Sequence, residues 1–98
     1  MYGLISKIVA GPNRRGELIT ILKESSSEMP GCLSCVIAED AADENGVWIT
    51  EIWESEASHQ KSLSLPAVKD AIGRAKPLIA GFSRTAVTKP VAGIQSGP

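Results

Sequence analysis

The chain has 98 residues, 43% of them hydrophobic and 21% charged, which is the composition of one ordinary globular domain. Its formal net charge is −1 and its lysines and arginines are scattered, which argues against nucleic acid as a partner. No apolar run approaches the roughly 20 residues that a membrane-spanning helix needs, so a membrane protein is not expected either.

The first element is predicted to be a strand over residues 2–10, where β-branched and apolar residues alternate around Lys7. Gly11-Pro12-Asn13 ends it. Because this alternation is typical of a strand and lacks the features of a signal peptide, we expect a cytoplasmic protein. An amphipathic helix follows and is predicted to continue to Pro30-Gly31; its apolar positions are Leu18, Ile19, Leu22 and Met29.

The middle of the chain is predicted to form a β-hairpin. Residues 32–39 and 47–53 have strand character, and the polar segment between them ends in Asn45-Gly46, a frequent hairpin turn. Ser55 then suits the N-cap of a short helix that carries His59.

A further helix is predicted from Pro66, with Val68, Ala71, Ile72 and Ala75 as its buried stripe. Gly81 is expected to break the chain before a last strand over residues 82–89. Residues 1–90 then form one domain, and residues 91–98 form a tail that we expect to be loose.

The element order β-α-β-β-α-β predicts an α+β fold of the ferredoxin-like type, with helices on one face of an antiparallel sheet. Leu4 and Ile8 lie on one face of the first strand, and Ile5 and Val9 lie on the other. Because an uncovered apolar sheet face favours association, we expect a homodimer in which two sheets pack face to face as a dimeric α/β barrel.

The two cysteines, Cys32 and Cys35, have the C-x-x-C spacing of redox sites. That motif normally opens a helix, whereas here it lies at the start of a predicted strand. Positions three apart on a regular strand point to opposite faces, so a disulfide between the two is disfavoured. A metal site is not expected, because a second pair of ligands is missing.

Glu51-Ile52-Trp53 at the end of a strand, followed by Ser55-Glu56-Ala57 and then His59, forms the most informative stretch of the chain. Together with Pro30-Gly31-Cys32 upstream, it resembles the pattern of the antibiotic biosynthesis monooxygenase superfamily, over about residues 2–90. The resemblance implies a homodimeric, cofactor-independent enzyme that oxidises a phenolic, quinol or anthrone-like small molecule with O2.

On this resemblance His59 is the candidate catalytic base, since an unperturbed histidine titrates near pH ~6.5. Trp53 is expected to supply an apolar wall for the aromatic substrate, and Glu51 and Arg84 are further candidate substrate-binding residues. Tyr2 and Ser6 are weaker candidates for steering the phenolic oxygen. No cofactor or metal is implied.

Simpler interpretations stay open for the same residues. His59 could be a surface or capping residue, and Glu51 could pair with Arg84 across the sheet. Trp48 and Trp53 point to opposite faces of one strand, so one should pack under the helices and the other into a sheet–sheet interface.

Three other functions remain as alternatives. The first is a catalytically silent dimer of the same fold that binds an apolar ligand or has a regulatory role. An isomerase or decarboxylase that uses the same base is less favoured. Haem degradation, found in a related branch, is disfavoured, because residues 2–10 lack an Asn and neither a Trp nor a His follows His59.

Overall fold

The computed structural model describes residues 1–26 and 29–93. Its four strands and three α-helices follow the predicted order, and a short 3-10 helix precedes the last strand. Their bounds are β1 Tyr2–Ala10, α1 Arg15–Ser25, β2 Cys32–Glu39, β3 Gly46–Trp53, α2 Glu56–Ser62, α3 Pro66–Ala75, η1 Lys76–Leu78 and β4 Ile79–Thr88.

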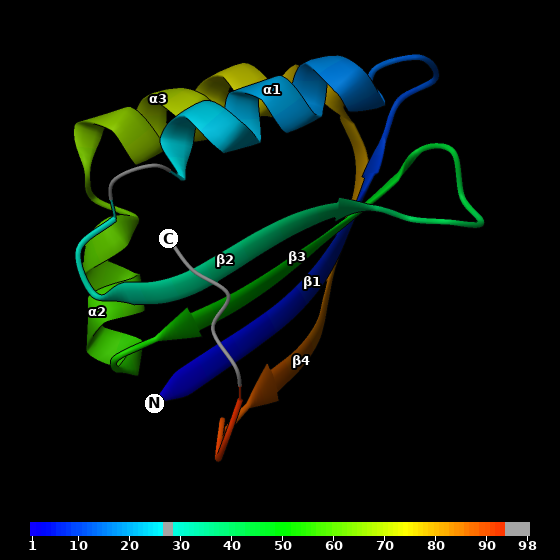
Figure 1. The fold of residues 1–98 in the computed structure, drawn as a ribbon. Coiled ribbons are helices and arrows are strands. Elements are labelled where there is room, and N and C mark those ends of the chain that lie inside the picture. Colours follow the sequence, from blue (N-terminus) through cyan, green and yellow to red (C-terminus); the bar gives the residue numbers. More distant parts are fainter. Residues whose placement is uncertain (27–28, 94–98) are drawn as a thin grey trace.

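The strands form one antiparallel sheet in the order β2-β3-β1-β4. Helices α1 and α3 lie side by side over one end of the sheet, and α2 lies at the other end, where β1 begins and β3 ends (Figure 1). This arrangement is the ferredoxin-like α+β fold that the element order predicts. No helix among the described residues is long and apolar enough to cross a membrane.

Alternate residues of the central strand β1 face the helices. Ile8 and Ala10 lie in the core together with Leu18 and Ile21 of α1 and Val47 of β3. The opposite face of the sheet, which we call the open face, carries Ile5 and its cross-strand neighbour Thr50, and Lys7 beside Trp48. No described helix covers the open face (Figure 1).

Helix α1 is shorter than predicted, since it ends at Ser25 and not near Met29. The hydroxyl of Ser25 donates to the carbonyl of Leu22, and that of Ser26 donates to the carbonyl of Lys23. Because serine hydroxyls compete for backbone hydrogen bonds in this way, they favour the end of a helix. The segment that was expected to continue the helix includes residues 27–28, which lie outside the described residues.

Two details of the second half of the chain also differ from the prediction. Gly81 does not break the chain but lies within β4, opposite Val9, so this strand begins three residues earlier than expected. Ile72 is exposed although it has the spacing of the buried stripe. The other three members of that stripe, Val68, Ala71 and Ala75, are buried as predicted.

The hairpin of β2 and β3 forms as predicted, with Asn45 in its turn and Gly46 at the start of β3, and its turn is organised by Asp40. Asp40 Oδ1 accepts from the backbone N–H groups of Ala42 and Asp43 at 2.8 and 2.9 Å. Its Oδ2 accepts from the Trp48 indole at 2.7 Å and lies 3.4 Å from Lys7 Nζ. The hairpin is therefore held by one carboxylate with four partners.

Acid should destabilise the protein through Asp40. The Trp48 indole, together with the two backbone N–H groups, holds the pKa of the Asp40 carboxyl well below its usual range. The ionised form therefore stabilises the fold above the unfolded pKa of about 3.9, and this contribution is lost as the pH falls towards the folded value. We expect Asp40→Asn to lower the free energy of unfolding at pH 7 and to flatten its decline below pH ~4, as measured by urea unfolding.

The matched control is Asp70→Asn, because Asp70 is an exposed carboxylate paired with Arg74 on α3, and surface pairs of this kind contribute little. A decline with acid that is equally steep in the wild type and in Asp40→Asn would contradict the role given to Asp40.

Candidate functional site

His59 is buried at the end of the sheet that α2 covers. The side chain of Ser55 caps α2 by accepting from the backbone N–H of Ser58, and this places His59 on the inner side of the helix. The His59 ring centroid lies 5.3 Å from that of Trp53, edge to face, and 5.9 Å from that of Tyr2. The imidazole therefore packs against two aromatic rings, and His59 is only 6% exposed.

One ring nitrogen of His59 has no protein partner. Nδ1 is buried and has no hydrogen-bond partner among the described residues. An unpaired polar atom inside a protein costs about 1–3 kcal/mol, so such atoms are rare and call for an explanation. No protein group among the described residues occupies this ring nitrogen.

Glu51 orients the Trp53 side chain. Both residues lie on the helix-facing side of β3, and Trp53 Nε1 donates to Glu51 Oε1 at 3.1 Å. Trp53 itself is fully buried at 0% exposure. Glu51 is thus linked to His59 through the indole that the two residues share as a neighbour.

The predicted pairing of Glu51 with Arg84 is wrong, because no ion pair joins them among the described residues. Glu51 lies opposite Leu4 on β1, whereas Arg84 lies opposite Ser6 on the other side of that strand. With β1 between them and a two-residue offset along it, their backbones are about 12 Å apart. The structure therefore brings His59, Trp53 and Glu51 together and leaves the exposed Arg84 outside this cluster.

Cys32 and Cys35 point to the same face of the sheet, contrary to the prediction. A bulge between Cys32 and Ser34 places Cys32 opposite Trp53 and Cys35 opposite Glu51, and these two partners share the helix-facing side. Burial raises the pKa of the Cys35 thiol to about 12, and the Glu51 carboxylate adds to this shift. Burial also raises the pKa of Cys32. Because thiolates are the reactive form, both cysteines are poor candidates for redox chemistry.

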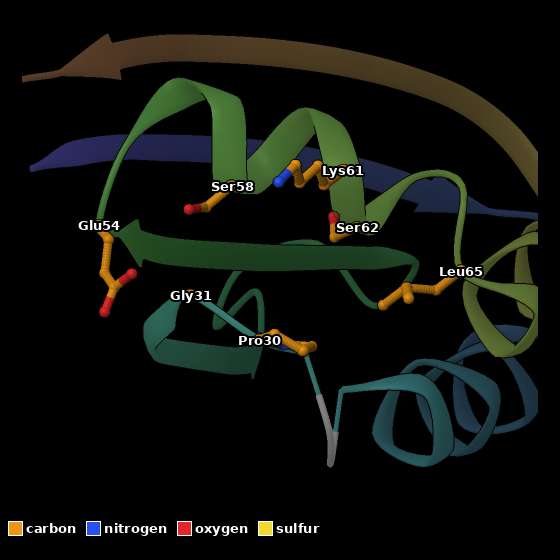
Figure 2. A pocket seen from close by; sticks show the side chains of 7 residues that line it. All are labelled: Pro30, Gly31, Glu54, Ser58, Lys61, Ser62 and Leu65. Atoms are coloured by element: carbon orange, nitrogen blue, oxygen red, sulfur yellow. The ribbon is translucent and has the colours of Figure 1, made fainter.

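A hollow of about 300 Å³ lies between α2 and the turn before β2. Figure 2 shows its lining residues, which include Ser58, Lys61 and Ser62 from α2 and Pro30 and Gly31 from the turn before β2. His59 does not line this hollow. It is an accessible recess of mixed polar and apolar lining beside the helix that carries His59, and His59 is not part of its wall.

Gly31 allows the turn before β2 to approach α2 closely. Its φ of +86° is in the left-handed region, and a Cβ built there would lie 2.6 Å from Ser58 Cβ. We expect Gly31→Ala to reduce the free energy of unfolding by about 1–3 kcal/mol. Guanidinium unfolding would measure this loss.

Gly73 provides the control for this substitution. It lies in α3, where a Cβ would meet no atom within 4 Å. Because alanine is the better helix former, Gly73→Ala should stabilise the protein by about 1 kcal/mol. Equal effects of the two substitutions would contradict the close approach at Gly31.

The structure also contains an apolar cavity of about 510 Å³, at the end of the sheet that α1 and α3 cover. Eight of its ten lining residues are apolar, among them Ile8, Val68, Ile79 and Phe82. Ile8 and Tyr2 are six positions apart on β1, which corresponds to about 20 Å along a strand. Ile8 is therefore distant from Tyr2, and no residue of the aromatic cluster around His59 lines the cavity.

One feature of the His59 site was missed at the sequence level. Ser62 is buried, and its hydroxyl donates to the His59 carbonyl at 2.6 Å, which ties down the last turn of α2. Its position three residues after His59 is the only sequence signal for this contact. The described residues contain no group of three or more potential metal ligands.

Comparison with known proteins identifies the family of the chain. The family model described as antibiotic biosynthesis monooxygenase matches residues 1–74. The chain belongs to this family. The match includes every residue of the His59 cluster, namely Tyr2, Glu51, Trp53 and His59. The comparison with curated proteins gave no match.

Solved structures of candidate antibiotic biosynthesis monooxygenases share the fold. One from Chloroflexus aurantiacus J-10-fl is 52% identical, with 98% of each chain covered and a TM-score of 0.93. One from Deinococcus radiodurans is 22% identical, with both chains fully covered and a TM-score of 0.79. A third, from Bacteriodes thetaiotaomicron VPI-5482, is also 22% identical, with coverage of 98% and 95% and a TM-score of 0.84. The last two matches support the fold alone.

Proposed function

We propose that the protein is a cofactor-independent monooxygenase that oxidises a phenolic, quinol or anthrone-like small molecule with O2, and that His59 is its base. Membership of the antibiotic biosynthesis monooxygenase family supports this class of reaction. The observation that carries the proposal is the buried His59 imidazole, which lies against Tyr2 and Trp53 and has one unpartnered nitrogen.

The proposed reaction balances without an external reductant. His59 accepts the acidic proton of the substrate, and the resulting anion gives one electron to O2. The two radicals combine to a hydroperoxide, which loses water. For an anthrone, the CH2 group and O2 become a C=O group and H2O, so the substrate supplies all the electrons. The role of the protein is to bind the aromatic ring, remove a proton and keep water away from the intermediates.

The first test is oxygen uptake by the metal-free protein with a panel of hydroquinones and anthrones. The proposal predicts uptake above autoxidation, with one O2 consumed for each anthrone converted to its quinone. If no member of the panel is turned over faster than in buffer, the proposed activity loses its support.

We further propose that the protein is a homodimer through the open faces of its sheets. Val36 of β2 lies on this face, opposite Thr50, and is 55% exposed in the single chain. Ile5, Val9 and Ile52 lie on the same face. Since burying this apolar surface is favourable, two copies gain stability by packing these faces together. The cytoplasmic location expected from the sequence stays a prediction.

The dimer predicts that a charge on the open face will separate the subunits. We expect Val36→Lys to weaken dimerisation by at least about tenfold, because a buried ammonium without a partner is costly. Sedimentation velocity over a dilution series would measure the monomer–dimer equilibrium.

Val87→Lys is a matched control for Val36→Lys. Val87 is 56% exposed on β4, but it lies opposite Leu4 and so faces the helix side of the sheet. Dissociation caused by Val87→Lys but not by Val36→Lys would mean that the copies meet through another surface.

A second candidate function is supported by the apolar cavity at the far end of the sheet. Its walls are formed by side chains such as Ile8, Ile79 and Phe82, which are suited to holding an apolar ligand and offer no base. On this alternative the protein is a dimeric ligand-binding or regulatory module of the same fold without catalytic activity. Absence of oxygen uptake together with saturable binding in this cavity would favour it.

A further inference from the structure

The apolar cavity opens to solvent, and large apolar side chains are exposed at its mouth. Phe82 of β4 is 62% exposed and Ile72 of α3 is also exposed, although both line the cavity. Two large apolar side chains in water beside an apolar cavity favour a ligand that buries them. The volume of about 510 Å³ is in the usual range of small-molecule sites, about 300–1,000 Å³.

The polar part of the lining carries a single positive charge. The two polar lining residues are Ser25 and Lys76, and no acidic residue lines the cavity. The other basic residue near the end of α3, Arg74, pairs with Glu24 and with Asp70. Lys76 has no ion pair among the described residues, so its ammonium group is available to an anion at the cavity.

We propose that this cavity is a binding site for a small amphiphilic carboxylate. The apolar chain or ring of the ligand packs against Ile72, Ile79 and Phe82, and its carboxylate pairs with Lys76. The proposal extends the second candidate function by naming the class of ligand. It does not depend on the oxygenase activity, because none of the residues that line the cavity belongs to the His59 cluster.

The proposal is tested by NMR titration of the isotope-labelled full chain with octanoate, 1-octanol and octylammonium. We expect saturable shifts at Ile72, Ala75, Ile79 and Phe82 for octanoate, with about tenfold weaker binding of octanol. Octylammonium should bind more weakly than octanol. The His59 imidazole signal should not move.

Two variants distinguish the contribution of the Lys76 charge to ligand binding from that of the apolar walls. Lys76→Met should weaken octanoate binding about tenfold, to the level of octanol, and leave octanol binding unchanged. Lys69→Met is the matched control, because Lys69 is an exposed lysine of α3 that does not line the cavity, and it should change neither. Ala71→Leu should reduce binding of both ligands by filling the cavity.

Several outcomes would overturn the proposal. Equal binding of octanoate and octylammonium, or octanoate binding that survives Lys76→Met, would remove the anionic class of ligand. If octanol still bound and Ala71→Leu abolished that binding, the second candidate function would stand without the carboxylate proposal. Shifts centred on His59 and Tyr2 would place ligand binding at the proposed oxygenase site instead.

Discussion

Replacing His59 with glutamine is expected to reduce oxygen uptake by about 100-fold or more, because general base catalysis contributes about 10²–10⁴ in rate. Glutamine can occupy a similar volume between Tyr2 and Trp53, but it cannot accept a proton at neutral pH. The rate with an anthrone substrate should therefore fall. The residual rate should also lack the pH dependence that a protein base gives to the wild type. Oxygen consumption and quinone formation would be measured together.

The control for this substitution is Gln60→Ala, on the exposed side of the same helix. It should leave uptake unchanged. Because His59 is buried, circular dichroism and the unfolding midpoint of His59→Gln must show that the variant is folded. Oxygen uptake that survives in a folded His59→Gln protein would assign the base to another residue. It would contradict the role of His59 and not the proposed oxygenase activity.

Replacing Trp53 with alanine is expected to lower the free energy of unfolding by about 3–5 kcal/mol, the usual cost of removing a buried aromatic side chain. Trp53 is fully buried, contacts the His59 ring, and donates to Glu51. Domains of this kind have about 5–15 kcal/mol of stability in total, so the loss is a large share. Guanidinium unfolding at one fixed protein concentration would measure it, since dimerisation makes stability depend on concentration.

Two further variants make this prediction specific. Trp53→Phe keeps most of the packing and should cost less than Trp53→Ala. Phe82→Ala removes an aromatic ring that is mostly exposed and should cost less than about 1 kcal/mol. A loss at Phe82 as large as that at Trp53 would mean that Trp53 does not anchor the site end of the sheet.

The site was predictable to the extent that it depends on local sequence. Glu51, Trp53 and His59 lie within nine residues of one another, on the end of a strand and the next helix, so alternation and the Ser55 cap place them near each other. The partner of Glu51 was not predictable. Opposite charges suggested Arg84, but the strand order puts β1 between the two, and the Trp53 indole is closer.

The bulge in β2 shows the same limit. Regular alternation predicts opposite faces for Cys32 and Cys35, whereas one extra residue in the strand puts both on the helix-facing side, opposite Trp53 and Glu51. A bulge depends on how two strands pair, and a single strand carries little signal for it. The environment of the two thiols, and with it their raised pKa, was therefore decided by strand pairing.

The sequence alone determined the order of elements, the faces of the central strand and the family, because these depend on periodicity, caps and short motifs along the chain. Tertiary structure alone decided that Ile72 is exposed at the mouth of a cavity although its spacing matches that of its buried neighbours. It also decided that His59 has an unpartnered nitrogen between two rings. The physical reason is that burial and hydrogen bonding depend on which elements meet in space, and helical or strand periodicity fixes only the direction in which a side chain points.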